Sequence, residues 1–405
     1  MNSNPSRPVL LHRPFVCFLC ARAATFMAFQ MLGVAVGWQI YALTGSAMYL
    51  GLVGLAQFLP MFLLTLVVGQ VADRYDRKNI ARLCQIIEGL SAGTLALASL
   101  AGWQSKESIL LIICVVGAAR AFEGPSLQAL LPGLVPVGIF PRAAAWSSSA
   151  MQTATIVGPA LGGFLYAAGP DIVYMTTGMV FLAAVMFMSL IRIDRRPAQH
   201  EPVTVQSVFA GISFIRSQRE ILGAISLDLF AVLLGGATAL LPVYARDILA
   251  TGPWGLGLLR SAPALGAVLM SVYLARRPLR HHVGRSMFRA VAVFGTATML
   301  FAVSTSFLLS FILLVILGAS DVISVVIRHS LVQIRTPDAM RGRVSAVNSM
   351  FIGTSNQLGE FESGVTAALF GTVPAVLIGG IGTIIVVALW RRFFPQLAEV
   401  DTLGQ

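Results

Sequence analysis

Long apolar runs, separated by short polar segments, follow one another along the whole chain. Each run has about 20 residues or more, the length that an α-helix needs to cross a hydrocarbon core about 30 Å thick. The period-two alternation of membrane β-strands is absent from the sequence. The pattern predicts an all-α integral membrane protein with twelve transmembrane helices, at 15–43, 47–71, 79–102, 108–131, 143–168, 172–192, 220–245, 254–275, 286–305, 307–330, 343–370 and 373–394.

Composition supports the membrane interpretation. Of the 405 residues, 57% are hydrophobic and only 11% are charged, whereas soluble domains have about a quarter of their residues charged. The net charge of +11 raises the question of nucleic acid as a partner. Because the cations flank the apolar runs, they indicate membrane orientation instead, so we expect a lipid bilayer and no nucleic acid.

The cations also predict the orientation of the chain. With both termini in the cytoplasm, all but six of the 28 Lys and Arg residues lie on the cytoplasmic side, in agreement with the positive-inside rule. The exceptions are Arg22, Arg120, Arg260 and Arg328 inside spans, and Lys106 and Arg246 outside. We therefore expect a multi-pass protein of the cell membrane (the inner membrane, in a bacterium) with cytoplasmic termini.

The longest polar stretch divides the spans into two sets of six. Its latter part has apolar residues at helical spacing, which predicts an amphipathic helix along the membrane surface. The expected organisation is an amino-terminal tail at 1–14, a six-helix bundle at 15–192, a linker at 193–219, a second six-helix bundle at 220–394 and a tail at 395–405.

An internal repeat relates the two halves. Residues 129–163 align with 330–364 without a gap, and the identical pairs include Pro136/Pro337, Gly158/Gly359 and Gly163/Gly364. Two homologous bundles with a site between them are typical of secondary transporters that work by alternating access.

The charged segment "GQVADRYDRK" joins the second and third spans. Gly69, Asp73, Arg74, Arg77 and Lys78 match the G-x-x-x-D-R-x-x-R-[RK] loop motif, and the chain thereby resembles the major facilitator superfamily. Asp76 stands where that family usually has glycine. The resemblance implies two pseudo-symmetric six-helix bundles whose spans 1, 4, 7 and 10 line a central cavity.

Two further motifs support this resemblance. "RAFEG", which begins at Arg120, resembles the R-x-x-x-G motif, and "GPALGG" resembles the antiporter motif through Gly158, Pro159, Gly162 and Gly163. The first two spans are similar to the enterobactin-exporter branch. The resemblance implies export, while ordinary close helix packing remains the alternative for these glycines.

The loop is a candidate gating latch. Asp73 is expected at the amino terminus of span 11, where the helix dipole favours an anion, with Arg343 nearby. The alternative for Arg74, Arg77 and Lys78 is that they only anchor the loop at the cytoplasmic surface.

Ionisable residues at membrane depth are candidates for proton coupling, because they are costly to keep there. We expect Asp228, Asp321 and then Glu123 to carry protons, with Arg120 as the fixed cation. A fixed structural network is the alternative. Glu88 is interpreted as a polar packing residue. For Glu360 and Glu362 two locations remain open: the domain interface and the water outside the membrane.

The polar side chains Gln30, Gln152, Asn348 and Asn356 are the candidate substrate contacts. We expect a monomeric, proton-coupled exporter of a small amphipathic molecule, such as a drug or a siderophore. The alternatives are a proton-coupled importer and, less favoured, a channel. The sequence has no metal-ligand cluster, nucleophile elbow or phosphate-binding loop, so no enzyme activity, cofactor or metal is expected.

Overall fold

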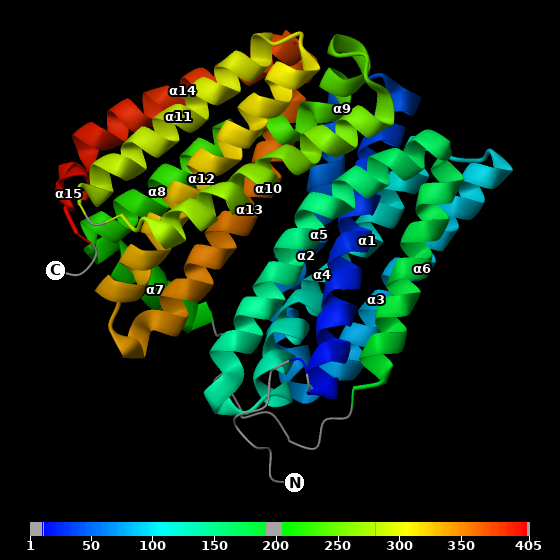
Figure 1. The fold of residues 1–405 in the computed structure, drawn as a ribbon, viewed down its shortest axis with the longest axis horizontal. Coiled ribbons are helices and arrows are strands. Elements are labelled where there is room, and N and C mark those ends of the chain that lie inside the picture. Colours follow the sequence, from blue (N-terminus) through cyan, green and yellow to red (C-terminus); the bar gives the residue numbers. More distant parts are fainter. Residues whose placement is uncertain (1–9, 11, 192–204, 280, 403–405) are drawn as a thin grey trace. The chain divides into compact units, whose positions relative to one another are not determined.

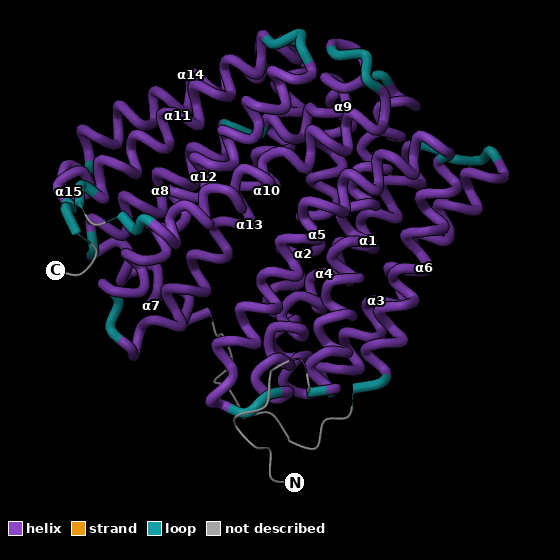
Figure 2. The backbone as a smooth tube through the Cα atoms, in the orientation of Figure 1, coloured by secondary structure: helices purple, strands orange, loops and turns teal. Residues whose placement is uncertain are grey.

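The computed structural model describes residues 10, 12–191, 205–279 and 281–402, and within these ranges its regular structure consists of helices (Figure 2). Ten helical segments are long and apolar enough to cross a membrane. Helices α5 and α13 have the length as well, with 29 and 33 residues, although their sequences are more polar. The predicted all-α class is confirmed, and the twelve long segments agree with the twelve predicted spans.

Apart from α8 (Arg219–Leu234), which ends within the span predicted at 220–245, the long helices begin and end within about five residues of the predicted boundaries. Those of the amino-terminal half are α1 (Arg13–Thr44), α2 (Ala47–Arg74), α3 (Arg77–Ala101), α4 (Lys106–Leu134), α5 (Phe140–Ala168) and α6 (Pro170–Ser189). Those of the carboxy-terminal half are α8 (Arg219–Leu234), α10 (Gly252–Arg276), α11 (Val283–Val303), α12 (Phe307–Arg335), α13 (Asp338–Phe370) and α14 (Thr372–Phe393). Two short helices, α7 (Val205–Ser217) and α15 (Pro395–Glu399), accompany the second group.

Local capping explains several of these ends. Asp76 is the N-cap of α3, and its carboxylate accepts a hydrogen bond from the Lys78 backbone N–H at 2.8 Å. Ser105 and Ser108 form a reciprocal capping box at the start of α4. Gly102 ends α3 with φ +69°, a left-handed conformation that glycine adopts without steric cost. The departure from the loop motif at position 76 thus supplies a helix cap.

The chain forms two compact units. The first contains Met1–Thr44 and Ala56–Pro202. In it α1 packs against α5 and α6, and α3 packs against α4 and α6 (Figure 1). At one end of the unit, Phe15, Phe18, Leu127 and Met188 form part of a buried apolar cluster.

The second unit contains Gly45–Leu55 and Val203–Gln405, so the first residues of α2 group with it. In this unit α10 and α11 pack on α12, and α8 packs on α13 and α14 (Figure 1). Gly51 and Gly364 allow α2 and α13 to approach closely, because a Cβ on Gly364 would lie 2.6 Å from the Gly51 Cα. The amphipathic helix α7 packs against α13 and α8, and its Ile215 is buried there.

The seventh predicted span is interrupted. Helix α8 stops at Leu234, and after Gly235 and Gly236 the chain continues as a 3₁₀ turn (η3, Ala237–Leu240), a short turn (α9, Leu241–Val243) and a π-helical turn (η4, Tyr244–Ile248). The two glycines permit close contacts. A Cβ on Gly236 would lie 2.5 Å from the Gly359 carbonyl oxygen, and one on Gly235 would lie 2.5 Å from the Phe294 ring. Hydropathy alone predicts one continuous helix here.

The carboxy-terminal segment folds back onto the helices. Leu397 of α15 is fully buried, and the Val283 and Gly284 N–H groups donate to the carbonyls of Asp401 and Val400. The Asp401 carboxylate accepts the His282 N–H at 2.9 Å and lies 3.3 Å from His281 Nδ1. The His282 N–H and then His281 hold the pKa of Asp401 below its usual range.

Candidate functional site: two buried acid–arginine clusters

The second unit contains a buried ion pair between α8 and α12. Arg328 Nη1 donates to Asp228 Oδ2 at 2.5 Å, and the Ser324 hydroxyl donates to Asp228 Oδ1 at 3.3 Å. All three residues are 5% exposed or less. A charge-assisted hydrogen bond of this kind compensates a carboxylate that would otherwise be costly to bury. We call Asp228, Asp321, Ser324 and Arg328 the carboxy-terminal cluster.

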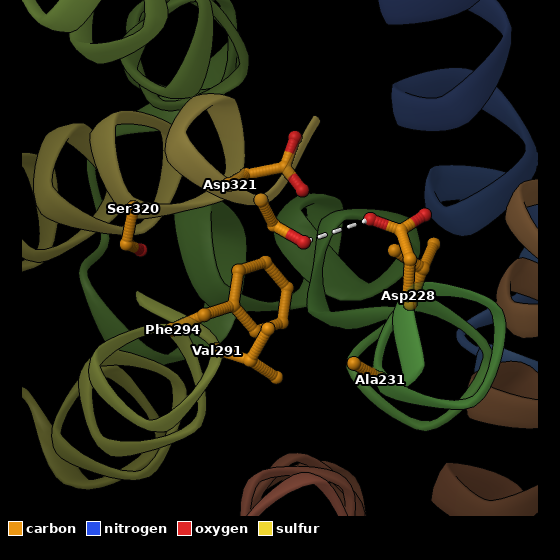
Figure 3. A pocket seen from close by; sticks show the side chains of 8 residues that line it. Asp228, Ala231, Val291, Phe294, Ser320 and Asp321 are labelled. Atoms are coloured by element: carbon orange, nitrogen blue, oxygen red, sulfur yellow. Dashed lines mark hydrogen bonds between the residues drawn. The ribbon is translucent and has the colours of Figure 1, made fainter. Parts of the chain in front are cut away.

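A second acid lies beside this pair. Asp321, two helical turns before Arg328 on α12, lines the same small pocket as Asp228 (Figure 3). The pocket has room for about one water molecule. Its full lining is Asp228, Ala231, Val232, Val291, Phe294, Ser320, Asp321 and Ser324. Two carboxyl groups, those of Asp228 and Asp321, therefore lie near one arginine, Arg328.

The first unit has a comparable cluster between α3 and α4. Arg120 Nη1 lies 3.6 Å from Glu123 Oε2, one helical turn away on α4, and Gln85 Nε2 donates to Glu123 Oε1 at 3.2 Å. The Arg120 guanidinium stacks over the Phe29 ring of α1 at 3.7 Å from its centroid. Glu88, one turn after Gln85 on α3, is also buried here. We call Gln85, Glu88, Arg120 and Glu123 the amino-terminal cluster.

The cations of the charged loop contact main-chain carbonyls within the first unit. Lys78 Nζ donates to the carbonyls of Ser189 and Ile191, where α6 ends, and Arg77 donates to the carbonyl of Ala129 near the end of α4. Cations at helix carboxy termini satisfy free carbonyls and favour the dipole. This is a local structural role for Arg77 and Lys78 that sequence reasoning did not anticipate.

The remaining latch residues are less constrained. Arg74 is exposed, and Arg343 is exposed with its guanidinium 3.8 Å from the Met340 sulfur. Gly69 and Asp73 belong to α2, and the side chain of Asp73 lies outside the described part of the structure. The latch itself stays a prediction.

The antiporter-like motif lies on the face of α5 that packs against α1. Gly158, Pro159, Gly162 and Gly163 are all buried. A Cβ on Gly158 would lie 2.7 Å from the Gln30 Cβ, and one on Gly162 would lie 2.9 Å from the Met31 Cα. The glycines bring two helices together, as small residues do in membranes.

The predicted substrate contacts have different environments. In the first unit Gln30 is half-buried against Gly158, and Gln152 is half-buried on α5. In the second unit Asn348 is 2% exposed and Asn356 is exposed, both on α13. Their role in substrate binding stays a prediction.

Sequence reasoning missed the role of Arg328. The sequence places Arg328 within span 10, but it favours only Arg120 as the cation that balances the buried acids. A signal was available, since Arg328 follows Asp321 by seven residues and therefore lies on the same helix face. Glu360, left open in the sequence analysis, lies against Gly54 and interacts electrostatically with Arg260.

Two helical units with buried acids and arginines within membrane-crossing helices define the chain as a multi-pass membrane protein. The family described as "Transmembrane secretion effector" matches residues 9–404, and the chain belongs to it. It lies in the enterobactin-exporter branch of the major facilitator superfamily, as the sequence motifs predicted. It is 28% identical to the enterobactin exporter EntS of Citrobacter koseri, over 95% of this chain and 93% of that protein. It is 26% identical to EntS of Escherichia coli O1:K1, over 96% of each chain.

Solved structures confirm the fold. A bacterial homologue of the human lysosomal transporter Spinster, inward-facing and occupied, superimposes with a TM-score of 0.75 at 15% identity, over 98% of this chain and 99% of that one. The D-xylose–proton symporter gives a TM-score of 0.71 at 11% identity, over 95% of this chain and 98% of that one. At these identities the likeness shows the shared fold alone, and the chain is a secondary transporter by family.

Proposed function

We propose that this protein is a proton-coupled exporter of small amphipathic molecules, of the drug or siderophore type. It works by alternating access as a monomer. It lies in the bacterial inner membrane with both termini in the cytoplasm. The observation that carries the proposal is the carboxy-terminal cluster. In it Asp228 and Asp321 line one pocket and share one arginine, within helices that cross the membrane.

The coupling follows from charge balance. Arg328 compensates one carboxylate through a direct hydrogen bond. A second ionised carboxylate at membrane depth is costly, and a proton on Asp321 or Asp228 removes that cost. Proton-loaded and empty forms then differ in the conformation they favour, which links proton movement to a change of access.

Two features support export over import, and a third supports the orientation of the chain. The two relatives are named as exporters of enterobactin. The sequence carries "GPALGG", which resembles the antiporter motif. The cations of the loop at 69–78, at the ends of α4 and α6, suit a cytoplasmic surface. A proton-coupled importer is the second candidate, because it would need the same acid–arginine cluster.

The test uses purified protein in inside-out vesicles with an imposed acidic interior, and enterobactin and ethidium as separate probes. We expect at least one probe to accumulate inside while the proton gradient discharges. Asp228→Asn and Asp321→Asn should still exchange the probe down its gradient but should not accumulate it. Glu107→Gln, a change at an exposed acid, serves as the control. Release of preloaded probe from the vesicles together with the outward-moving protons would establish import.

A further inference from the structure

Glu88 is a fully buried acid of the first unit. Its side chain is 0% exposed, and neither carboxyl oxygen has a hydrogen-bond partner among the described residues. A Cβ on the next residue, Gly89, would lie in van der Waals contact with Gly178 and Phe181 of α6. An ionised carboxylate in such a place lacks both water and donors, which costs several kcal/mol.

The charges near Glu88 come from α4. Glu88 interacts electrostatically with Glu123 and with Arg120. Arg120 is paired with Glu123, which also accepts the Gln85 hydrogen bond. The other cation of the region, Arg22 on α1, donates to the Ser147 hydroxyl at 2.9 Å. Helix α6 contributes apolar side chains and a glycine at this level. Glu88 is thus the second acid beside a cation that is already paired.

We propose that Glu88 is a proton-binding site of the first unit, separate from Asp228 and Asp321, and that it holds a proton while Glu123 is ionised beside Arg120. The proposal rests on the proposed function for its role in transport. The protonated form needs no countercharge, which fits a buried carboxyl without partners. If a proton passes from Glu88 to Glu123, the net charge of the amino-terminal cluster stays the same. One of the two acids is protonated both before and after the transfer.

The same arrangement occurs in both units. In each, two acids lie beside an arginine, and a single acid has the direct contact with it. In the amino-terminal cluster Arg22 also interacts electrostatically with Glu123, and it donates its hydrogen bond to Ser147. Each unit therefore has room for one ionised acid and one neutral acid. The chain accordingly has two proton-binding sites, one in the amino-terminal cluster and one in the carboxy-terminal cluster.

A direct test is infrared spectroscopy of the full chain in liposomes at neutral pH. A protonated carboxyl has a C=O stretching band that is separate from carboxylate bands and shifts in D₂O. Glu88→Gln should lose one such band relative to the wild type. Glu107→Gln, which replaces the carboxyl group of a side chain that is 71% exposed, should lose no protonated-carboxyl band. An unchanged protonated-carboxyl band in Glu88→Gln would overturn the proposal.

The folding of Glu88→Gln provides a second test of the proposal. Glutamine has the shape and neutrality of protonated glutamate, so Glu88→Gln should fold and keep the thermal unfolding midpoint of the wild type. Failure to fold would show that the ionised form is needed, which contradicts the proposal. In transport, Glu88→Gln should lower the number of protons moved per probe molecule by one. If no probe discharges the gradient in the wild type, the proposed function fails, and the infrared result still decides the state of Glu88.

Discussion

At the scale of single residues, the sequence identifies the acids better than it identifies their partners. Asp228, Asp321 and Glu123 are conspicuous because each interrupts an apolar run. The pairing of Asp228 with Arg328 joins residues 100 positions apart, and it depends on how α8 and α12 are rotated against each other. Periodicity reveals which residues share a helix face but not which face meets which neighbour.

Removing Arg328 should be strongly destabilising. Arg328→Met leaves Asp228 buried without its cation, and we expect a loss of about 3–5 kcal/mol in the free energy of unfolding. In the double variant Arg328→Met/Asp228→Asn most of this loss should be recovered, because no buried charge is left unpaired. A thiol-reactive dye can follow thermal unfolding, since Cys17 and Cys84 are buried in the folded chain.

The matched control is Arg246→Met. Arg246 pairs with Asp247 at 3.8 Å, but both side chains are more than 40% exposed, and such pairs contribute about 1 kcal/mol at most. Losses that simply add in the Arg328/Asp228 double variant would show that the two residues do not act as a pair.

At the scale of elements, the sequence predicts where helices end, but hydropathy does not predict the break inside the seventh span. Proline, glycine and capping side chains mark the boundaries around Asp76, Gly102 and Ser105. The break at Gly235 and Gly236 falls within a run that is apolar throughout, so hydropathy does not detect it. At the break α13 approaches closely at Gly359, a tertiary contact that hydropathy does not report.

Substitution of Gly236 tests this contact. In Gly236→Ala the new methyl group would lie 2.5 Å from the Gly359 carbonyl oxygen, so the helices must separate. We expect a destabilisation of about 1–3 kcal/mol, measured by the same dye assay. Gly93→Ala on α3 is the control, because no atom lies within 4 Å of its new Cβ, and it should be neutral or stabilising. Equal effects of the two changes would mean that the approach of α13 is unimportant.

Docking of the carboxy-terminal segment should depend on pH. The pKa of Asp401 lies below its usual value, so the ionised carboxylate favours the docked segment. That contribution is complete above the pKa of the undocked carboxyl, near 4, and is lost as the pH falls through the lower pKa of the docked state. The protection of the Val283 and Gly284 amides against hydrogen–deuterium exchange, measured relative to the intrinsic exchange rate at each pH, should therefore fall only below about pH 4.

Asp401→Asn provides the comparison. Its Val283 and Gly284 amides should be less protected than those of the wild type at neutral pH, and their protection should not fall further in acid, because the ionised group is gone. A loss of protection in the wild type at a pH well above 4 would contradict a role for this carboxylate.

At the scale of the whole molecule, composition and repetition are sufficient to predict the class of protein. The spacing of apolar runs predicts the spans, the cations predict the orientation, and the loop motif with "GPALGG" predicts the superfamily. What the sequence does not reveal is that Gly45–Leu55 groups with the second unit. That grouping depends on glycine contacts such as Gly51 with Gly364, whose partners are over 300 residues apart.

The proposed latch belongs to this scale. Asp73→Asn removes a charge and keeps the shape, so insertion should be normal. An anion at a helix amino terminus contributes about 0.3–2 kcal/mol, which corresponds to a shift of about 2- to 30-fold between inward-open and outward-open forms. Accessibility labelling of introduced cysteines measures that ratio, and turnover of the probe should fall with it.

Asp76→Asn is the control in the same loop, because asparagine caps a helix as well as aspartate does. It should leave labelling and turnover close to those of the wild type. Unchanged labelling and turnover in Asp73→Asn would reduce the loop to an orientation signal and a set of helix caps.

The fold-back of the last helix constrains how the chain can be handled. Gly284 has no space for a side chain, because a Cβ there would lie 1.7 Å from the Leu397 carbonyl oxygen, and Leu397 and Val400 complete a buried apolar cluster. A purification tag or fluorescent reporter that replaces residues from Pro395 onward would remove part of that cluster. A fusion joined after Thr402, through a flexible spacer, would leave the cluster and the Asp401 contacts with His281 and His282 in place.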